Sequence, residues 1–127
     1  MSIKTSLTEE LILGLLAEQP RHGYQIEKLI EDREMRRWTE VGFSSIYYVL
    51  DKLEKKELAK SAPAKGKEKK EYAITDLGLT VLAEKTKQRL LERQPANSHF
   101  MTALANSQNM SPKDLLQAFK ARKKVLE

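Results

Sequence analysis

The chain has 127 residues, of which 40% are apolar and 32% charged, and it contains no cysteine. The lack of cysteine excludes a disulfide scaffold and a zinc–thiolate site, and the length favours one domain over a multidomain enzyme. With 23 Lys+Arg against 18 Asp+Glu the formal net charge is +5, and only 5 glycines and 4 prolines are present, which predicts a soluble, mostly helical protein.

The patterning along the chain favours a cytoplasmic protein with no membrane segment. The longest nearly continuous apolar stretch, 11–17, is far shorter than the ~20 residues that a membrane span needs. Glu9 and Glu10 lie where a signal peptide would be basic. The positive surplus gathers in two places, a lysine-rich stretch between 60 and 70 and a basic run at 122–124. Such patches suit a polyanionic partner, although the surplus itself is small.

A first helix is predicted from about 6 to 18, because Ser6 followed by Glu9 is a capping-box pattern and Pro20 ends the segment. Its apolar residues fall on two faces, Leu7, Leu11 and Leu15 on one and Ile12, Leu13 and Leu16 on the other. A helix that is apolar most of the way round is usually covered on both sides. A partner subunit could supply the second cover.

Two further helices are predicted from His22 to Arg36 and from Phe43 to Lys56, on either side of Gly42. Their apolar stripes are Ile26, Leu29 and Ile30 in the first, and Ile46, Val49, Leu50 and Leu53 in the second. At 100° per residue the opposite face of the later helix presents Ser44, Tyr48, Asp51 and Lys55, flanked by Ser45, Tyr47 and Lys52. Asp51 and Lys55 are spaced to form an ion pair on that face.

A two-stranded hairpin and three more helices follow. Segments 58–63 and 70–75 are predicted to pair around a loop that contains Gly66. Thr75 or Asp76 caps a helix to about Arg93, another helix covers about Ser98–Asn106, and Ser111-Pro112 begins a last one. Nothing in the sequence stops that last helix after Lys124, so residue 127 is expected to interrupt it.

This order predicts a mainly α protein with a small two-stranded β-wing, a winged helix-turn-helix at 1–82 and a C-terminal helical dimerisation region at 83–127. In such folds the third helix lies in the DNA major groove and the basic ribbon lies along the backbone or in the minor groove. The order of elements therefore makes DNA binding the leading functional hypothesis.

Several motifs resemble the PadR family of bacterial winged-helix transcriptional regulators. They are His22-Gly23-Tyr24, Ile46-Tyr47-Tyr48-Val49-Leu50, Leu53-Glu54-Lys55 with Leu58, and Glu71-Tyr72-Ala73-Ile74-Thr75 with Gly78. The resemblance spans roughly 7–82. Similar proteins usually carry Gly-Thr in place of Ser44-Ser45, often Pro in place of Tyr48, and Gly in place of Glu57. The last difference matters physically, because a left-handed residue at a helix end costs a non-glycine roughly 1 kcal/mol.

The resemblance implies a homodimeric repressor that binds a palindromic double-stranded DNA operator and is released by a small molecule or another signal. It also implies that the first helix and the C-terminal helices of the partner pack together. The apolar residues predicted for that interface are Leu7, Leu11, Leu115, Leu116 and Phe119.

The residues predicted to contact DNA lie in the second helix, the third helix and the wing. Serine hydroxyls and tyrosine phenols read base edges or bind phosphate, and lysines beside a glycine at a wing tip approach the backbone. Tyr47 is predicted to lie nearer the core, combining packing with a hydroxyl on phosphate. The full set is Tyr24, Ser44, Ser45, Tyr47, Tyr48, Lys52, Lys65, Gly66, Lys67, Lys69 and Lys70.

Other kinds of site receive little support from the sequence. Trp38 and Phe100 are candidates for contact with an apolar or aromatic effector, although Trp38 is more often a core residue. The two histidines, His22 and His99, are far apart in sequence, so no metal or cofactor is expected. No nucleophile motif or phosphate-binding glycine loop occurs, which argues against an enzyme.

Two alternative functions remain open. A winged helix can serve as a protein-interaction module that binds no DNA, and its binding would then depend little on salt. It can also bind DNA architecturally, through the ribbon and the basic run, without reading bases. Competition with random DNA separates this second case from an operator-binding regulator.

Overall fold

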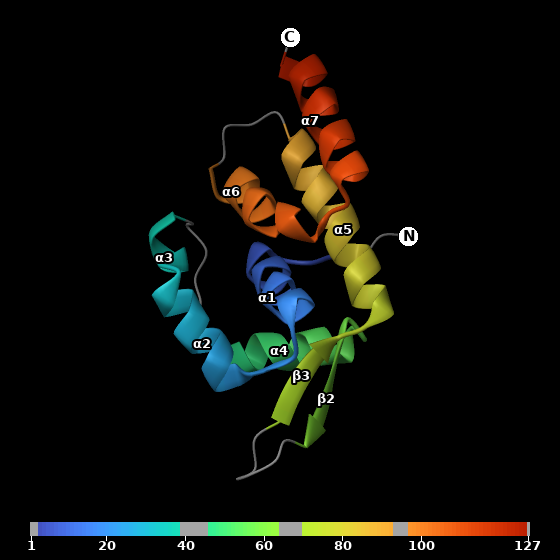
Figure 1. The fold of residues 1–127 in the computed structure, drawn as a ribbon. Coiled ribbons are helices and arrows are strands. Elements are labelled where there is room, and N and C mark those ends of the chain that lie inside the picture. Colours follow the sequence, from blue (N-terminus) through green and yellow to red (C-terminus); the bar gives the residue numbers. More distant parts are fainter. Residues whose placement is uncertain (1–2, 39–45, 64–69, 93–96, 127) are drawn as a thin grey trace.

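A computed structural model describes residues 3–38, 46–63, 70–92 and 97–126. The elements in chain order are α1 (Leu7–Glu18), β1 (Arg21–His22), α2 (Gly23–Asp32), α3 (Met35–Trp38), α4 (Ile46–Lys55), β2 (Ala59–Pro63), β3 (Lys70–Ile74), α5 (Asp76–Leu91), α6 (Asn97–Asn106), the 3₁₀ turn η1 (Ser107–Asn109) and α7 (Pro112–Leu126). The chain folds around one central helix, α1, with α2, α4 and the β-hairpin at one end and the last helix at the other (Figure 1).

The central helix α1 begins with the predicted capping box. The Ser6 hydroxyl accepts a hydrogen bond from the Glu9 N–H, and the Glu9 carboxylate accepts one from the Ser6 N–H. Both apolar faces of α1 are buried, one against α4 and β3 and the other against α5 and α6 (Figure 1). The expectation that a partner subunit covers the second face is corrected, because the chain's own C-terminal helices cover it.

Two adjacent carboxylates of α1 are buried and point to different elements. Glu9 accepts hydrogen bonds from Lys56 Nζ, at the end of α4, at 2.8 and 3.0 Å. Glu10 accepts a two-pronged contact from Arg89 of α5, with its shorter N–O distance 2.9 Å. Burial opposes ionisation of Glu9, but hydrogen bonds from Lys56 and the Ser6 N–H outweigh it and lower its pKa. Through these pairs α1 is connected to the end of α4 on one side and to α5 on the other.

A third carboxylate, Glu18, joins three elements at the end of α1. It accepts hydrogen bonds from Arg33 at 2.8 Å, from Arg21 at 2.8 Å and from Gln108 of η1 at 2.9 Å. The Arg33 hydrogen bonds lower the pKa of Glu18 despite its partial burial. A negative charge at a helix C-terminus opposes the helix dipole, and the two guanidinium groups offset that repulsion.

The predicted helix 22–36 is wrong at its C-terminal end, because the chain forms two helices there. α2 ends at Asp32, Glu34 adopts a left-handed φ of 52°, and α3 then begins at Met35. Met35 is buried in the main core. The break turns this side chain inward, and no glycine in the sequence signals it.

The predicted hairpin is confirmed, and a short third strand joins it. β2 and β3 pair antiparallel with Ser61 opposite Tyr72, close to the predicted limits. β1 pairs with the other edge of β3, Arg21 opposite Tyr72, so the sheet order is β1-β3-β2. The sheet therefore has one more strand than the two predicted from the sequence. The two residues of β1 are too few to show an alternating pattern.

A tight corner connects α4 to the wing and to α5. Glu57 follows α4 with φ 62°, the left-handed conformation predicted where similar proteins carry glycine. Leu58 N–H donates to the Leu53 carbonyl at 2.9 Å and Glu57 N–H donates to the Glu54 carbonyl at 3.0 Å, the pattern of a Schellman motif. Thr75 caps α5 by accepting from the Gly78 N–H at 2.9 Å, and its hydroxyl donates to the Glu57 carbonyl at 2.7 Å. One threonine thus fixes both helix ends.

The C-terminal helices form a smaller second core and interlock with α1. α5 runs through residue 82 without a break, and Leu90, Ala103 and Ala118 are buried together. Asn106 Nδ2 donates to the Glu10 carbonyl at 3.2 Å, and a Cβ on Gly14 would lie 2.0 Å from Asn106 Oδ1. Only a glycine lets α6 approach α1 this closely. None of the helices in the described ranges is both long enough and apolar enough to cross a membrane.

Candidate nucleic-acid interface

The helix α4, predicted to be the recognition helix, divides into a buried face and an exposed face, as its sequence predicts. Ile46, Leu50 and Leu53 are buried in the main core. Tyr47 and Tyr48 are 56% and 64% exposed. Because the buried stripe holds the helix against α1 and α2, its polar and aromatic face is presented to solvent beside the wing (Figure 1).

Short contacts along α4 organise this exposed face. The predicted ion pair is present, with Lys55 Nζ 3.9 Å from Asp51 Oδ2, but both groups are exposed and the pair adds little stability. Lys52 Nζ lies 5.7 Å from the centre of the Tyr48 ring, within cation–π range. A positive charge and an aromatic ring therefore lie together at the middle of the face.

Tyr47 packs against the protein as predicted, but on a neighbouring helix and less deeply than expected. It was expected nearer the core, yet more than half of the side chain is exposed. Its packing partner is the backbone of Gly23 at the start of α2, where an added Cβ would lie 2.5 Å from Tyr47 Cε1. The next residue, Tyr24, is 59% exposed. The starts of α2 and α4 thus bring phenol groups to one surface.

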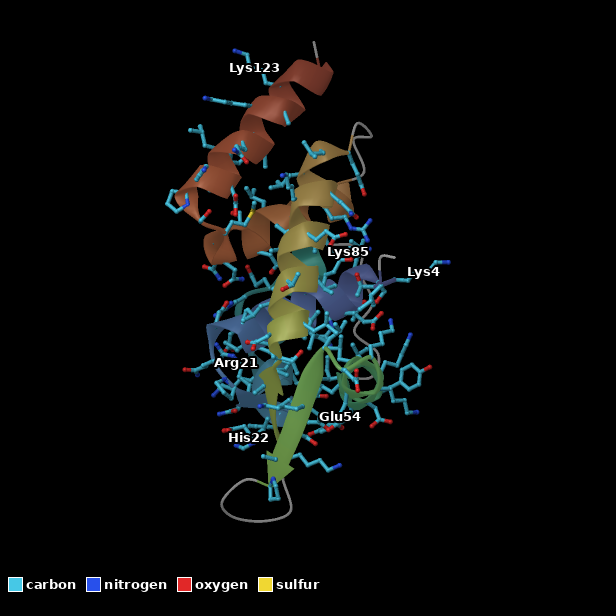
Figure 2. All side chains as sticks on the ribbon, turned by 90° about the vertical axis from the view of Figure 1, so that its right-hand side faces the viewer. Lys4, Arg21, His22, Glu54, Lys85 and Lys123 are labelled. Carbon is cyan, nitrogen blue, oxygen red and sulfur yellow. The ribbon has the colours of Figure 1, made fainter. Side chains whose placement is uncertain are left out.

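The base of the wing is tied to α4 through Glu54, which Figure 2 shows between the helix and the strands. Its carboxylate accepts hydrogen bonds from the backbone N–H of Ser61, at 3.1 Å, and from the Ser61 hydroxyl. Tyr72 of β3 is buried behind this contact, and desolvation followed by the charge of Glu54 raises its pKa. Wing and recognition helix are therefore held in a fixed relation.

The wing brings an exposed lysine to each strand, Lys60 on β2 and Lys70 on β3. Of the other residues predicted to contact DNA, Ser44 and Ser45 and the wing-tip residues Lys65, Gly66, Lys67 and Lys69 lie outside the described residues. The side chains of the candidate effector residues Trp38 and Phe100 do as well. DNA contact by these residues stays a prediction.

The residues expected at a dimer interface are divided by the fold. Leu11 is 1% exposed within its own chain, so it is not available to a partner, and Leu7 is half-buried. Leu115 packs against the C-terminal core. Leu116 and Phe119 of α7 are 55% and 40% exposed. Among the predicted set, these two leave a large apolar surface uncovered.

Several supporting residues were not predicted from the sequence. Glu9 with Lys56 and Glu10 with Arg89 are separated by 47 and 79 positions along the chain, and Glu54 reaches the wing. No local pattern signals contacts at such separations. In the described part of the chain no three His, Cys, Asp or Glu side chains gather as a metal site would require.

Comparison with known proteins assigns this architecture to a family. The model described as "Transcriptional regulator PadR-like family" matches residues 12–84, which run from α1 into α5. Uncharacterized protein X of Lysinibacillus sphaericus is 32% identical over 83 residues, covering 63% of this chain and 75% of that protein. No solved structure matches the chain. The family match covers more than half of the sequence and includes the recognition helix and the wing, and the chain therefore belongs to the PadR-like family of DNA-binding winged-helix transcriptional regulators.

Proposed function

We propose that the protein is a cytoplasmic, homodimeric repressor that inserts α4 into the major groove of a palindromic operator and lays its wing along the backbone. The observation that carries the proposal is the exposed face of α4, where Tyr47, Tyr48 and Lys52 lie beside the wing strands while the opposite face is buried. A recognition helix needs this division, because one face must be anchored while the other reads DNA.

Reading and positioning fall to different residues in this proposal. Tyr48 and the serines Ser44 and Ser45, which precede it on the same predicted helix face, offer hydroxyl and ring contacts to base edges. Lys52, Lys70 and the wing-tip lysines offer charge to phosphates, which fixes the docking without reading sequence. Pairing with Lys55 reduces the repulsion of Asp51 by phosphate.

Dimerisation is proposed through α7, whose exposed Leu116 and Phe119 need cover. This helix lies at the end of the molecule opposite the wing (Figure 1). A two-fold contact there leaves both recognition helices free to reach half-sites about 34 Å apart, one turn of the duplex. Sedimentation tests the contact: wild type should be a dimer and Leu116→Asp a monomer, and a Leu116→Asp dimer as stable as wild type would contradict it.

Release of the operator is assigned to a small apolar or aromatic effector. The hollow between α5 and η1, lined by Leu82, Thr86 and Asn106 among others, holds about 20 Å³, which suits a water molecule. A drug-sized ligand needs a few hundred Å³, more than this hollow holds. We place the effector instead between the winged-helix part and the C-terminal helices, near Trp38 and Phe100. Titration of phenolic compounds against tryptophan fluorescence and DNA affinity tests this placement, and quenching without a change in affinity would count against it.

The central experiment is to recover genomic DNA fragments that bind the protein, sequence them, and measure affinity for the enriched duplex and a scrambled duplex. With ~6 phosphate contacts per dimer, affinity should fall about 1,000-fold between 50 and 200 mM salt. A flat salt response would favour the protein-interaction module, and equal affinity for both duplexes would favour the architectural binder.

A pair of matched variants separates the two kinds of contact. Tyr48→Ala should reduce the preference for the enriched duplex by about 1–3 kcal/mol. Lys70→Ala should weaken both duplexes alike and make the salt slope shallower by about one unit per contact. The opposite pattern would contradict the docking of α4 in the groove.

A further inference from the structure

The first residue of α2, Gly23, has a structural requirement that its backbone does not explain. Glycine is needed where φ is positive or where another group approaches the backbone too closely for a side chain. Gly23 has no left-handed φ, and it starts a regular helix where alanine would be favoured by propensity. The remaining reason is a close approach.

The approaching group is the ring of Tyr47 from the recognition helix. An ideal Cβ on Gly23 would lie 2.5 Å from Cε1, 2.8 Å from Cζ and 3.1 Å from Cδ1 of Tyr47. Carbon atoms in contact normally lie 3.5–4.0 Å apart, so a side chain at position 23 would displace the exposed Tyr47 ring from this place. One edge of the ring therefore rests directly on the α2 backbone.

This contact also determines where the phenol hydroxyl is. Cζ, which carries the hydroxyl, is among the ring atoms closest to Gly23, so the hydroxyl lies over the start of α2. The rest of the side chain is exposed, and Gly23 itself is buried under it. In a docked helix-turn-helix, the first helix of the motif, here α2, crosses the sugar–phosphate backbone. The hydroxyl is thus placed where both helices meet the backbone.

We infer that Gly23 is a positioning residue for DNA binding. The Tyr47 ring packs on its backbone, and this contact orients the phenol to donate a hydrogen bond to a phosphate of the bound duplex. The inference rests on the proposed docking of α4. It assigns Tyr47 to the backbone and leaves base reading to the centre of the α4 face, at Tyr48.

The test uses wild type, Gly23→Ala, Tyr47→Phe, Tyr47→Ala and the double variant Gly23→Ala/Tyr47→Ala, with the enriched and scrambled duplexes. A hydrogen bond to a charged group corresponds to about tenfold or more in affinity. Because both subunits of the proposed dimer carry the substitution, Gly23→Ala and Tyr47→Phe should each lose about tenfold per bound subunit on both duplexes. The salt slope should not change, because the phenol is neutral and releases no counterion.

The double variant distinguishes positioning from a separate effect of Gly23. If Gly23 acts through Tyr47, the double variant binds as Tyr47→Ala does, because the added methyl group then meets no ring. The inference would be overturned if the double variant lost affinity by the product of the two single losses. Wild-type affinity in Gly23→Ala, or a loss confined to the enriched duplex, would overturn it as well.

Thermal unfolding provides the control for folding. The ring that must move is an exposed side chain and not backbone, so Gly23→Ala should melt within a few degrees of wild type. If it instead fails to fold, Tyr47→Phe decides alone, since it keeps the ring on Gly23 and removes only the hydroxyl, and wild-type affinity in that variant would overturn the inference. Absence of DNA binding by wild type itself would refute the proposed function, an outcome distinct from all of these.

Discussion

Replacing Glu57 by glycine should stabilise the protein, because the residue after α4 is held in a conformation that favours glycine. Its φ is 62°, and its side chain is exposed. The left-handed conformation costs a non-glycine residue about 1–2 kcal/mol. The greater freedom of glycine in the unfolded chain offsets about 0.4–1 kcal/mol of this relief. The net gain in the free energy of unfolding is then about 1 kcal/mol. Two hydrogen bonds of the corner are kept, from the Leu58 N–H to the Leu53 carbonyl and from the Thr75 hydroxyl to the Glu57 carbonyl.

The gain is measurable by urea and thermal denaturation followed by circular dichroism. About 1 kcal/mol corresponds to roughly 3–5 °C in a domain of this size. Glu57→Ala is the matched control, since it removes the same carboxylate and keeps a Cβ in the left-handed conformation, so it should give no gain. Equal stabilisation by both variants would show that the effect comes from the charge, and an unchanged or lower stability of Glu57→Gly would refute the backbone argument.

Three further predictions concern the ion pairs and the cap, and each is checked by urea denaturation. Lys56→Met should cost about 3 kcal/mol by leaving the buried Glu9 carboxylate unpaired, whereas Lys55→Met, which removes an exposed pair, should cost less than about 0.5 kcal/mol. Folding lowers the pKa values of Glu9 and Glu18. Their contribution to stability is therefore complete above the ordinary glutamate pKa and should be lost as pH falls below about 4. A protein that is equally stable at pH 3 would contradict this. Thr75→Ala should cost about 1–2 kcal/mol through loss of the cap, and a smaller loss than that of Lys55→Met would argue against the corner.

Local patterns in the sequence were sufficient to predict the helices that carry strong periodicity and their caps. The Ser6–Glu9 capping box, the Thr75 cap and the buried stripe of α4 follow from spacing over a few residues, and the structure confirms them. The left-handed conformation at Glu57 was expected only from the resemblance, because similar proteins carry glycine there. Each depends on interactions within one or two helical turns.

Features that depend on contacts across the fold were not predicted. Glu9 and Glu10 read as ordinary acids of a first helical turn, and their burial becomes evident only with Lys56 and Arg89 beside them. The break at Glu34 has no glycine or proline to mark it. Sequence reasoning also assigned the second face of α1 to a partner, because periodicity shows that a face needs cover without showing which segment supplies it.

The candidate site shows the same limit. The exposed face of α4 was predicted from its periodicity, since one helix carries it. The packing of Tyr47 on Gly23 was not predicted, because a pattern of apolar residues does not show which backbone surface a side chain will contact. Tyr47 was predicted to lie nearer the core and to combine packing with a hydroxyl on phosphate; its ring packs on the neighbouring helix α2 and is 56% exposed.

The close approach of α1 and α6 has a consequence for exchanging parts between regulators. Asn106 fits only against Gly14, and it also donates to the Glu10 carbonyl of the same helix. A chimaera that replaced the C-terminal helices with those of a relative, cut at the start of α5, would separate this pair and leave α1 facing foreign side chains. Positions 14 and 106 must therefore be transferred together. In a chimaera, α1 has to come from the same protein as α6, although most of the chain lies between them.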